Sequence, residues 1–322
     1  MSNASAIAVH DLEKRFGDLA ALDGVDFEVP QGTVFGLLGP NGAGKTTAVR
    51  ILATVLRADG GTAEVLGRDV AREPDAVRRR IGMAGQYAAV DPNLTGRENL
   101  ELIGTLAQLP KPRLKARAIE LLERFELTDA GDRPTRTYSG GMRRRLDVAA
   151  SLVQEPPVLF LDEPTTGLDL PSRNELWRMM RELVSEGTTV LLTTQYLEEA
   201  DVLADRIAVI DHGHVIANDT PANLKAGLGS TVIELTFDEQ AIDRAAGVIG
   251  GDAERDGTSV RITTDRSTKV LLETLRALDT AGIEPTGLTV REPSMDDVFL
   301  VLTGHRAEDG TPSTEPTTGG AR

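Results

Sequence analysis

The chain has 322 residues, a formal net charge of −15 at pH 7 and no cysteine. The negative charge argues against a protein that binds nucleic acid mainly by electrostatic attraction, because such proteins carry an excess of basic residues. The lack of cysteine excludes a disulfide framework and thiolate metal sites, and it is typical of a reducing compartment. The length allows one large domain or two smaller ones.

No targeting or membrane-spanning segment is expected from the sequence. Residues 1–11 lack the charged start and long apolar core of a signal peptide. The longest apolar runs have the length of strands, far short of the ~20 residues that span a bilayer. The chain is therefore not expected to form a path through a membrane by itself.

The first elements are short predicted strands at 7–9 and 25–29, joined by a polar loop, Lys14–Gly17. Phe16 stands out in this loop because aromatic residues make up only 3% of the sequence. Its ring either stacks on an adenine base or packs in the core, and the sequence favours neither interpretation.

A P-loop follows the apolar run Val34–Leu38, which is predicted to be a buried strand. Apolar residues at helical spacing come next, so the loop joins a strand to the start of a helix. Backbone N–H groups in such a loop surround phosphate oxygens. Lys45 is predicted to reach the outer phosphates and the Thr46 hydroxyl to bind Mg²⁺. The predicted cradle is Gly39, Pro40, Asn41, Gly42, Ala43, Gly44, Lys45, Thr46 and Thr47.

A mainly helical subdomain is predicted at about 91–153, after an apolar segment that ends at Gln86. Within it, Ser139 is a natural N-cap for a helix that continues to Val153. Gly140 and Gly141 expose the backbone N–H groups of the first helical turn, which makes this helix start a second candidate anion site.

Two adjacent carboxylates, Asp162 and Glu163, end the wholly apolar predicted strand Val158–Leu161. Ligands bind at the carboxyl ends of strands in open α/β sheets. We expect Asp162 to hold Mg²⁺ and Glu163 to accept a proton from an attacking water, a role worth ~10²–10⁴-fold in rate. The alternative, a strand that ends in an ordinary charged turn, is disfavoured by the preceding P-loop.

The loop before the next predicted helix, at about 172–185, contains Asp169. A β-branched strand then ends at Gln195, and a hairpin is predicted at 206–217. A glycine-rich stretch near 224–229 marks a domain boundary, so we predict domains at 1–228 and 229–304. The second domain has β-α-β-β-α-β order, followed by a tail, 305–322, expected to be disordered.

In this order and spacing, the motifs resemble the ATP-binding subunit of ABC transporters, over roughly residues 7–224. The fold class implied is α/β, a P-loop ABC ATPase core with a helical subdomain, plus a small α+β C-terminal domain. The resemblance assigns Gly39–Thr46 to Walker A, Tyr138–Met142 to the signature loop and Phe160–Glu163 to Walker B. It assigns Gln86 to the Q-loop and Gly167–Asp169 to the D-loop, and it implies that Asp169 contacts the nucleotide.

This resemblance implies a head-to-tail homodimer that holds two ATP molecules between its subunits. Lys45, Thr46 and Gln86 of one subunit then hold the phosphates and Mg²⁺, together with Asp162. The signature loop of the other subunit covers the γ-phosphate through Ser139 and its two glycines. Most members of the family have a histidine at the position of Gln195, and an amide can donate a hydrogen bond but carries no proton at neutral pH. We therefore predict a slow basal ATPase.

Three stretches narrow the resemblance to the daunorubicin-resistance type of ATP-binding protein: Gln86–Asp91, Gln195–Asp201 and Pro293–Gly304. In that type the ATPase and the permease are separate chains. The resemblance thus implies an ATPase of a drug exporter, held at the cytoplasmic face of the membrane by its permease. A groove near Tyr87 and Leu94 would receive a coupling helix of that permease.

The sequence argues against two other classes of protein, both of which also contain a P-loop. A P-loop GTPase is disfavoured because the sequence has no Asn/Thr-Lys-x-Asp element to read guanine. A non-transport ABC ATPase that acts on ribosomes or DNA usually has paired ATPase domains or a long coiled coil, and a more basic surface. This sequence has one such domain and a net negative charge.

Overall fold

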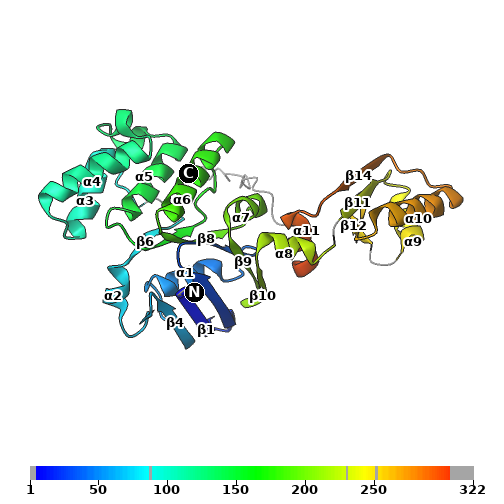
Figure 1. The fold of residues 1–322 in the computed structure, drawn as a ribbon, viewed down its shortest axis with the longest axis horizontal. Coiled ribbons are helices and arrows are strands. Elements are labelled where there is room, and N and C mark those ends of the chain that lie inside the picture. The colour runs from blue at the N-terminus through cyan, green and yellow to red at the C-terminus, as the bar shows by residue number, and fades with distance from the viewer. Residues whose placement is uncertain (1–4, 87–88, 230, 251–252, 305–322) are drawn as a thin grey trace, which may run out of the picture. The chain divides into compact units, whose positions relative to one another are not determined.

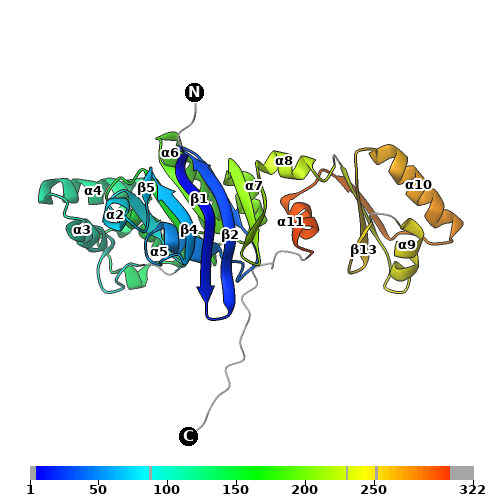
Figure 2. The same cartoon turned by 90° about the horizontal axis from the view of Figure 1, so that it is seen from below.

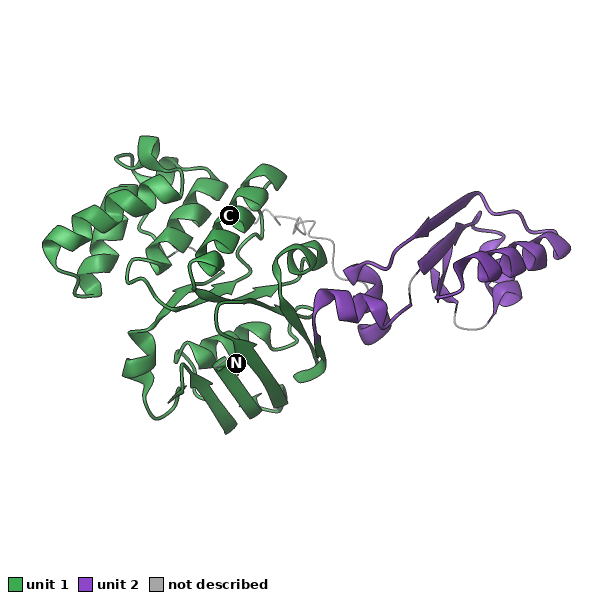
Figure 3. Cartoon of the chain, in the orientation of Figure 1, with its two compact units in different colours: residues 1–218, 307–322 green, residues 219–306 purple. Residues whose placement is uncertain are grey.

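The computed structural model describes residues 5–86, 89–229, 231–250 and 253–304. The chain divides into two compact units, residues 1–218 and residues 219–306 (Figure 3). The second unit thus begins before the glycine-rich stretch at which the sequence analysis placed the boundary. The predicted disordered tail, 305–322, lies outside the described residues.

The first unit contains two sheets. Its strands are β1 (Ser5–Phe16), β2 (Leu19–Pro30), β3 (Val34–Leu38), β4 (Gly60–Val65), β5 (Arg68–Asp69), β6 (Ile81–Ala84), β7 (Val158–Asp162), β8 (Thr189–Thr194), β9 (Arg206–Asp211) and β10 (His214–Asp219). Within the described residues, the larger sheet has the order β10-β9-β3-β8-β7-β6, and the smaller antiparallel sheet has the order β2-β1-β4-β5. The strands β6, β7, β8, β3 and β9 run parallel. Their carboxyl ends therefore meet at one edge of the sheet.

The helices of the first unit are α1 (Lys45–Leu52), α2 (Pro74–Arg78), α3 (Gly96–Leu106), α4 (Lys111–Arg124), α5 (Gly140–Ser151), α6 (Leu170–Ser185) and α7 (Leu197–Leu203). Figure 1 shows α3, α4 and α5 gathered together, and they contact one another. These three helices lie next to one another in a helical part of the unit, within residues 96–151. None of the helices in the described part of the chain combines the length and apolar character that a bilayer span requires.

Both faces of the parallel sheet are buried, as its apolar strands predict. Side chains alternate between the faces: Leu159 and Leu161 of β7 belong to the same buried cluster as Trp177 of α6, while Phe160 belongs to the cluster that contains Ala48 of α1. Strands β3, β7 and β8 are buried along their whole length. The residues at their carboxyl ends are thereby held on a rigid support.

The prediction of a loop at Lys14–Gly17 is wrong for residues 14–16, which belong to strand β1. Strand β1 continues through Phe16, which pairs with Leu19 of β2, and the turn between them contains Gly17 at φ +59°. Figure 2 shows β1 and β2 as a long hairpin beside β4. Lys14 pairs with Leu22 and Arg15 with Ala20, so polar residues of β1 continue the ladder opposite apolar residues of β2, which the pattern of β1 alone does not reveal.

The second unit has the predicted β-α-β-β-α-β order. Its elements are α8 (Pro221–Ala226), β11 (Thr231–Thr236), α9 (Ile242–Ile249), β12 (Glu254–Asp256), β13 (Ser259–Thr264), α10 (Ser267–Thr280), β14 (Gly287–Arg291) and α11 (Met295–Thr303). The sheet order is β12-β13-β11-β14, all antiparallel. Ile233, Leu235 and Phe237 form its core with apolar residues of α9 and α10.

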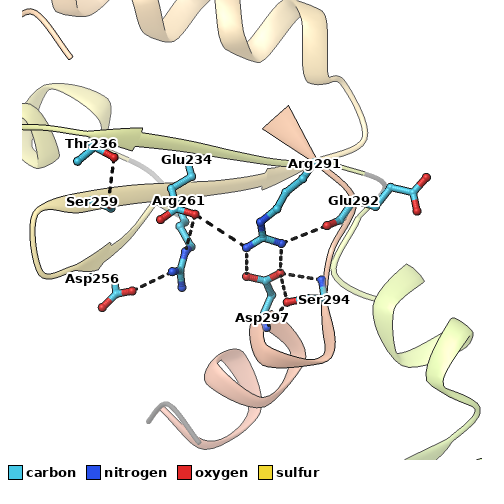
Figure 4. Close-up of polar contacts among 9 residues, drawn as sticks. All are labelled: Glu234, Thr236, Asp256, Ser259, Arg261, Arg291, Glu292, Ser294 and Asp297. Carbon is cyan, nitrogen blue, oxygen red and sulfur yellow. Dashed lines mark hydrogen bonds and ion pairs between the residues drawn. The ribbon is translucent and has the colours of Figure 1, made fainter. Parts of the chain in front are cut away.

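A polar network covers the other face of β11 and reaches the start of α11 (Figure 4). The guanidinium of Arg291 donates to Asp297 Oδ1 at 2.8 Å and to its Oδ2. Asp297 Oδ2 also accepts the backbone N–H of Ser294 at 2.7 Å, and Ser294 Oγ accepts the Asp297 N–H, which is a capping box. Arg261 joins Glu234 to Asp256 on the neighbouring strands.

Candidate functional site

The P-loop leaves β3 and enters α1 through backbone conformations that require glycine. Gly39 has φ +156°, and a Cβ there would lie 2.1 Å from the carbonyl oxygen of Ile210. Gly44 has φ +112°, and its Cβ would lie 2.3 Å from the carbonyl oxygen of Ala21. By contrast, a Cβ at Gly42 would meet nothing within 4 Å. Neighbouring backbone thus packs closely against Gly39 and Gly44 at the two ends of the loop, while the space beside Gly42 in its middle is open.

Lys45 begins α1 and is buried, with 5% of its surface exposed. Its Nζ donates to the carbonyl oxygens of Gly39 at 2.7 Å and Pro40 at 3.0 Å. These bonds hold the ammonium group against the loop. A compact positive charge and the N-terminus of a helix lie together here, which is the arrangement that binds phosphate.

Three elements meet at the carboxylate of Asp162, the last residue of β7. The Thr46 hydroxyl from α1 donates to Asp162 Oδ1 at 3.0 Å, and the Thr193 hydroxyl from β8 donates to the same oxygen at 2.6 Å. Asp162 is 3% exposed. Hydroxyl and carboxylate oxygens are the ligands that Mg²⁺ takes beside substrate phosphates, so this donor set fits the predicted ion. Thr193 was not predicted from the sequence.

Glu163 follows Asp162 with φ +48°, a conformation uncommon for a residue with a side chain. Its backbone N–H donates both to the Thr193 carbonyl oxygen, at 3.1 Å, and to the Thr193 hydroxyl, at 3.0 Å. The Thr166 hydroxyl donates to Glu163 Oε2 at 3.3 Å. Strained backbone of this kind is typical of functional sites, and here β8 holds it in place.

The sheet edge brings the remaining predicted polar residues to the same place. Gln86 follows the end of β6, Glu163 that of β7 and Gln195 that of β8, and these three strands are neighbours in the sheet. Gln86 is exposed and Gln195 is partly buried. Tyr87 lies outside the described residues. The adjacency of these residues in space is what the predicted parallel sheet requires.

The signature residues lie at the start of α5. Ser139 is its N-cap, and the Ser139 Oγ accepts the Met142 N–H at 3.2 Å. A Cβ at Gly140 would meet nothing within 4 Å, while a Cβ at Gly141 would lie 2.5 Å from the Ser172 Oγ of α6. Gly141 therefore packs closely against α6, and Gly140 leaves the first turn of α5 accessible.

Asp169, predicted to contact nucleotide, is the N-cap of α6. Its Oδ1 accepts the Ser172 N–H at 3.3 Å. Hydrogen bonds from the side chain and backbone of Ser172 hold the pKa of Asp169 below its usual value. The carboxylate is thus charged near neutral pH and fixed beside the residue on which Gly141 packs.

Phe16 does not belong to the core. It is 49% exposed, and the Lys14 Nζ lies 5.6 Å from its ring centroid. The core interpretation of this residue is therefore wrong. The stacking of Phe16 on adenine stays a prediction.

Comparison with known proteins gives the family. Residues 22–166 match the family model described as "ABC transporter". The chain is 57% identical over 312 residues to the daunorubicin resistance ATP-binding protein DrrA2 of Streptomyces coeruleorubidus, covering 94% of this chain and 97% of that one. It is 39% identical over 306 residues to the Nod factor export ATP-binding protein I of Ralstonia nicotianae, covering 94% and 95%.

Solved structures agree with the fold. One is titled "Structure of ATP binding subunit of ABC transporter", with a TM-score of 0.63 and 26% identity, covering 69% of this chain and 93% of that one. The P-loop, the carboxylates at the sheet edge and the capped glycine turn have the order expected of such subunits. The chain belongs to the ABC transporter ATPases, in the group of the daunorubicin-resistance ATP-binding proteins.

Proposed function

We propose that two copies of this chain hold two ATP molecules between them, head to tail, and that hydrolysis drives a separate membrane permease that exports a drug-like compound. The observation that carries this proposal is the joining of the P-loop to the sheet edge. There Thr46 and Thr193 both bond to Asp162, and Glu163 comes next in the chain.

Each residue has a distinct part in the proposed reaction. Lys45 and the P-loop N–H groups bind the phosphates, and the oxygens of Thr46 and Asp162 hold Mg²⁺, assisted by Gln86. The ion, when bound, neutralises charge on the phosphate oxygens. Glu163 accepts the proton of the attacking water. Gln195 donates a hydrogen bond to the γ-phosphate through its amide.

The signature turn serves the nucleotide of the partner copy in this proposal. Ser139 and the accessible N–H groups at Gly140 and Gly141 cover the γ-phosphate bound by the other subunit. Charge-assisted hydrogen bonds of this kind contribute about 1.5–3 kcal/mol each. ATP then bridges the two copies, and loss of the γ-phosphate releases them.

The names of the relatives support the proposed export of a drug-like compound. One relative is named for daunorubicin resistance and another for Nod factor export. We infer an export ATPase that lies at the cytoplasmic face of the membrane by binding its permease. Action on ribosomes or DNA, the second candidate, fits poorly with a net charge of −15 and one ATPase domain.

The experiment that tests the proposal compares Glu163→Gln with the double variant Lys45→Ala/Glu163→Gln. With Mg-ATP, Glu163→Gln is expected to form a dimer in gel filtration with light scattering, while the double variant remains a monomer. The cognate permease is included in a parallel sample. A Glu163→Gln protein that stays monomeric with ATP, alone and with permease, would contradict the ATP-sandwich dimer.

A further inference from the structure

A buried arginine, Arg144, joins two parts of the ATPase site by hydrogen bonds, the loop after β6 and the end of β7 with the loop that follows it. It lies on α5 and is 7% exposed. Its Nε donates to the Pro164 carbonyl oxygen at 2.7 Å, its Nη2 to that of Asp162 at 3.0 Å and its Nη1 to that of Gly85 at 2.5 Å. The rigid, planar donor fork of arginine suits this task, because all three acceptors are fixed relative to one another.

Asp147, one turn further along α5, completes the arrangement. It is 3% exposed, and its Oδ1 accepts the Ala89 N–H at 2.7 Å. Its Oδ2 accepts from Arg144 Nη1 at 3.0 Å. The two buried charges therefore compensate each other while each also bonds to backbone. We call Arg144 and Asp147 the α5 clamp.

The backbone groups held by the clamp flank the residues with predicted chemistry. Gly85 precedes Gln86 and Ala89 follows it, so the Q-loop is bonded on both sides. Asp162 and Pro164 likewise lie on either side of Glu163. Breaking any of these bonds leaves a buried carbonyl or charge without its partner, which costs about 1–3 kcal/mol or more. The clamp therefore opposes independent movement of the Q-loop and of Walker B.

The same helix starts at Ser139. In the proposed dimer this serine faces the partner's nucleotide, whereas Gln86 and Glu163 serve the nucleotide of their own subunit. Helix α5 thus has the signature turn at its N-terminus and the clamp one to two turns later. The residues that serve the two different nucleotides are joined through one rigid element.

We propose that Arg144 and Asp147 are positioning residues that fix the signature serine relative to the Q-loop and Walker B of the same subunit. Closure around the partner's ATP and alignment of the subunit's own catalytic glutamate then occur together. This inference rests on the proposed ATP-sandwich function. The P-loop lies on other elements, β3 and α1, so ATP binding itself does not depend on the clamp.

The test separates binding from turnover in the full-length chain. Arg144→Met is expected to lower kcat on the order of 10²-fold, the effect of a small misplacement of reacting groups. The Kd for a fluorescent ATP analogue is expected to stay within about twofold, because the P-loop is unchanged. Arg144→Lys restores part of kcat, since an ammonium reaches some of the acceptors. The control is Arg178→Met, which removes an exposed arginine hydrogen-bonded to Glu126 and Glu182.

A second measurement places Arg144→Met in the Glu163→Gln background and titrates ATP-dependent dimer formation. The proposal expects dimer formation to need at least about tenfold more ATP than in Glu163→Gln alone, equivalent to about 1.4 kcal/mol. If Glu163→Gln dimerises and the double variant does so equally well, with kcat of Arg144→Met also unchanged, the clamp proposal is overturned and the dimer stands. If Glu163→Gln itself never dimerises, the proposed function fails first and takes the clamp proposal with it.

A purely structural role for the clamp predicts a different pattern. In that case Arg144→Met lowers thermal stability, ATP affinity and kcat together, and this result would also overturn the proposal. Should Arg144→Met fail to fold, Asp147→Asn replaces it. The asparagine oxygen can still accept the Ala89 N–H, and the substitution removes the negative charge that faces Arg144. A lower kcat at unchanged ATP affinity supports the proposal, and unchanged kcat refutes it.

Discussion

Arg144 in the first unit, which is buried, and Arg291 in the second, which is partly buried, show two uses of a guanidinium. Both bond to an aspartate on a helix. Arg291 directs two nitrogens to Asp297, whose carboxylate also caps α11, and it pairs with Glu234 of β11, so this network joins one sheet to one helix start (Figure 4). Arg144 instead bonds mainly to backbone carbonyls of loops from different strands.

The difference indicates what each network does. A network that includes the N-cap of a helix stabilises that helix. A network that extends to loops at the carboxyl edge of a parallel sheet fixes the positions of ligand-binding residues. Substitutions in the first unit should therefore change catalysis more than folding. Substitutions in the second unit should do the reverse.

The largest expected effect is that of Glu163→Gln. Loss of the general base is expected to lower kcat by ~10²–10⁴-fold. The Kd for ATP and the midpoint of thermal unfolding should remain close to those of the wild type, because the amide keeps the volume of the side chain. Steady-state phosphate release and equilibrium ATP binding measure the two quantities. Turnover at the wild-type rate would remove Glu163 from the role of base.

Asp297→Asn should give the opposite result, a loss of stability at unchanged kcat. Burial by itself raises the pKa of Asp297, but hydrogen bonds from Arg291 and Ser294 outweigh burial and hold this pKa below its usual value. Loss of these charged hydrogen bonds is expected to cost about 1.5–3 kcal/mol. Hydrogen exchange of amides in β11 and α11 reports the local stability. If Asp297→Asn changed kcat while the amides of β11 and α11 kept full protection, the proposed difference between the two units would be wrong.

The Asp297 effect has a defined pH dependence. A depressed pKa in the folded state gives stabilisation that is complete above the unfolded pKa, about 3.9, and is lost as the pH falls through the folded value. The difference between wild type and Asp297→Asn should thus shrink below about pH 4. The control is Asp243→Asn, which affects an exposed pair with Arg255 and should cost less than about 1 kcal/mol at any pH.

Ser294→Ala tests the capping box alone. Removal of the hydroxyl that accepts the Asp297 N–H is expected to cost about 1 kcal/mol, since the Arg291–Asp297 pair remains. This corresponds to about a fivefold change in the local opening equilibrium of α11, again read by hydrogen exchange. A loss as large as that of Asp297→Asn would show that the hydroxyl, and not the ion pair, anchors the helix.

The smallest expected effect is that of Gln195→His in the first unit. Both side chains donate a hydrogen bond, so kcat at pH 8 should change by about threefold or less. The histidine introduces a group that titrates near pH 6.5, which the wild type lacks at this position. The variant should therefore gain a pH dependence of kcat between pH 6 and 7. A wild type with that same dependence would point to another titrating group.

Much of the site was predictable because it depends on local patterns. Apolar runs at Val34–Leu38 and Val158–Leu161 identify parallel strands, and parallel strands bring their carboxyl ends together. The order of elements in the second unit followed from the same alternation. What the sequence does not reveal are contacts between distant segments. Arg144 lies in a run of three arginines, and nothing local distinguishes the buried one from its exposed neighbour Arg143.

Thr193 was missed for a related reason. In a β-branched strand a threonine is chosen for its shape as often as for its hydroxyl. Only the register of β8 beside β7 shows that this hydroxyl reaches Asp162. Phe16 remained undecided because one exposed aromatic on a hairpin carries no periodicity. The roles of these residues thus depend on tertiary neighbours rather than on their own sequence context.

The close packing of Gly141 against Ser172 limits the size of the side chains at both positions. A Cβ at 141 would lie 2.5 Å from the Ser172 Oγ, so the small residue at each position sets the gap between the tips of α5 and α6. The Ser172 side chain therefore determines how closely the N-terminus of α5 approaches α6. A larger side chain at position 141 or 172 would push the N-terminus of α5 away from α6. The signature turn would then be displaced from the position in which it covers the partner's nucleotide in the proposed dimer.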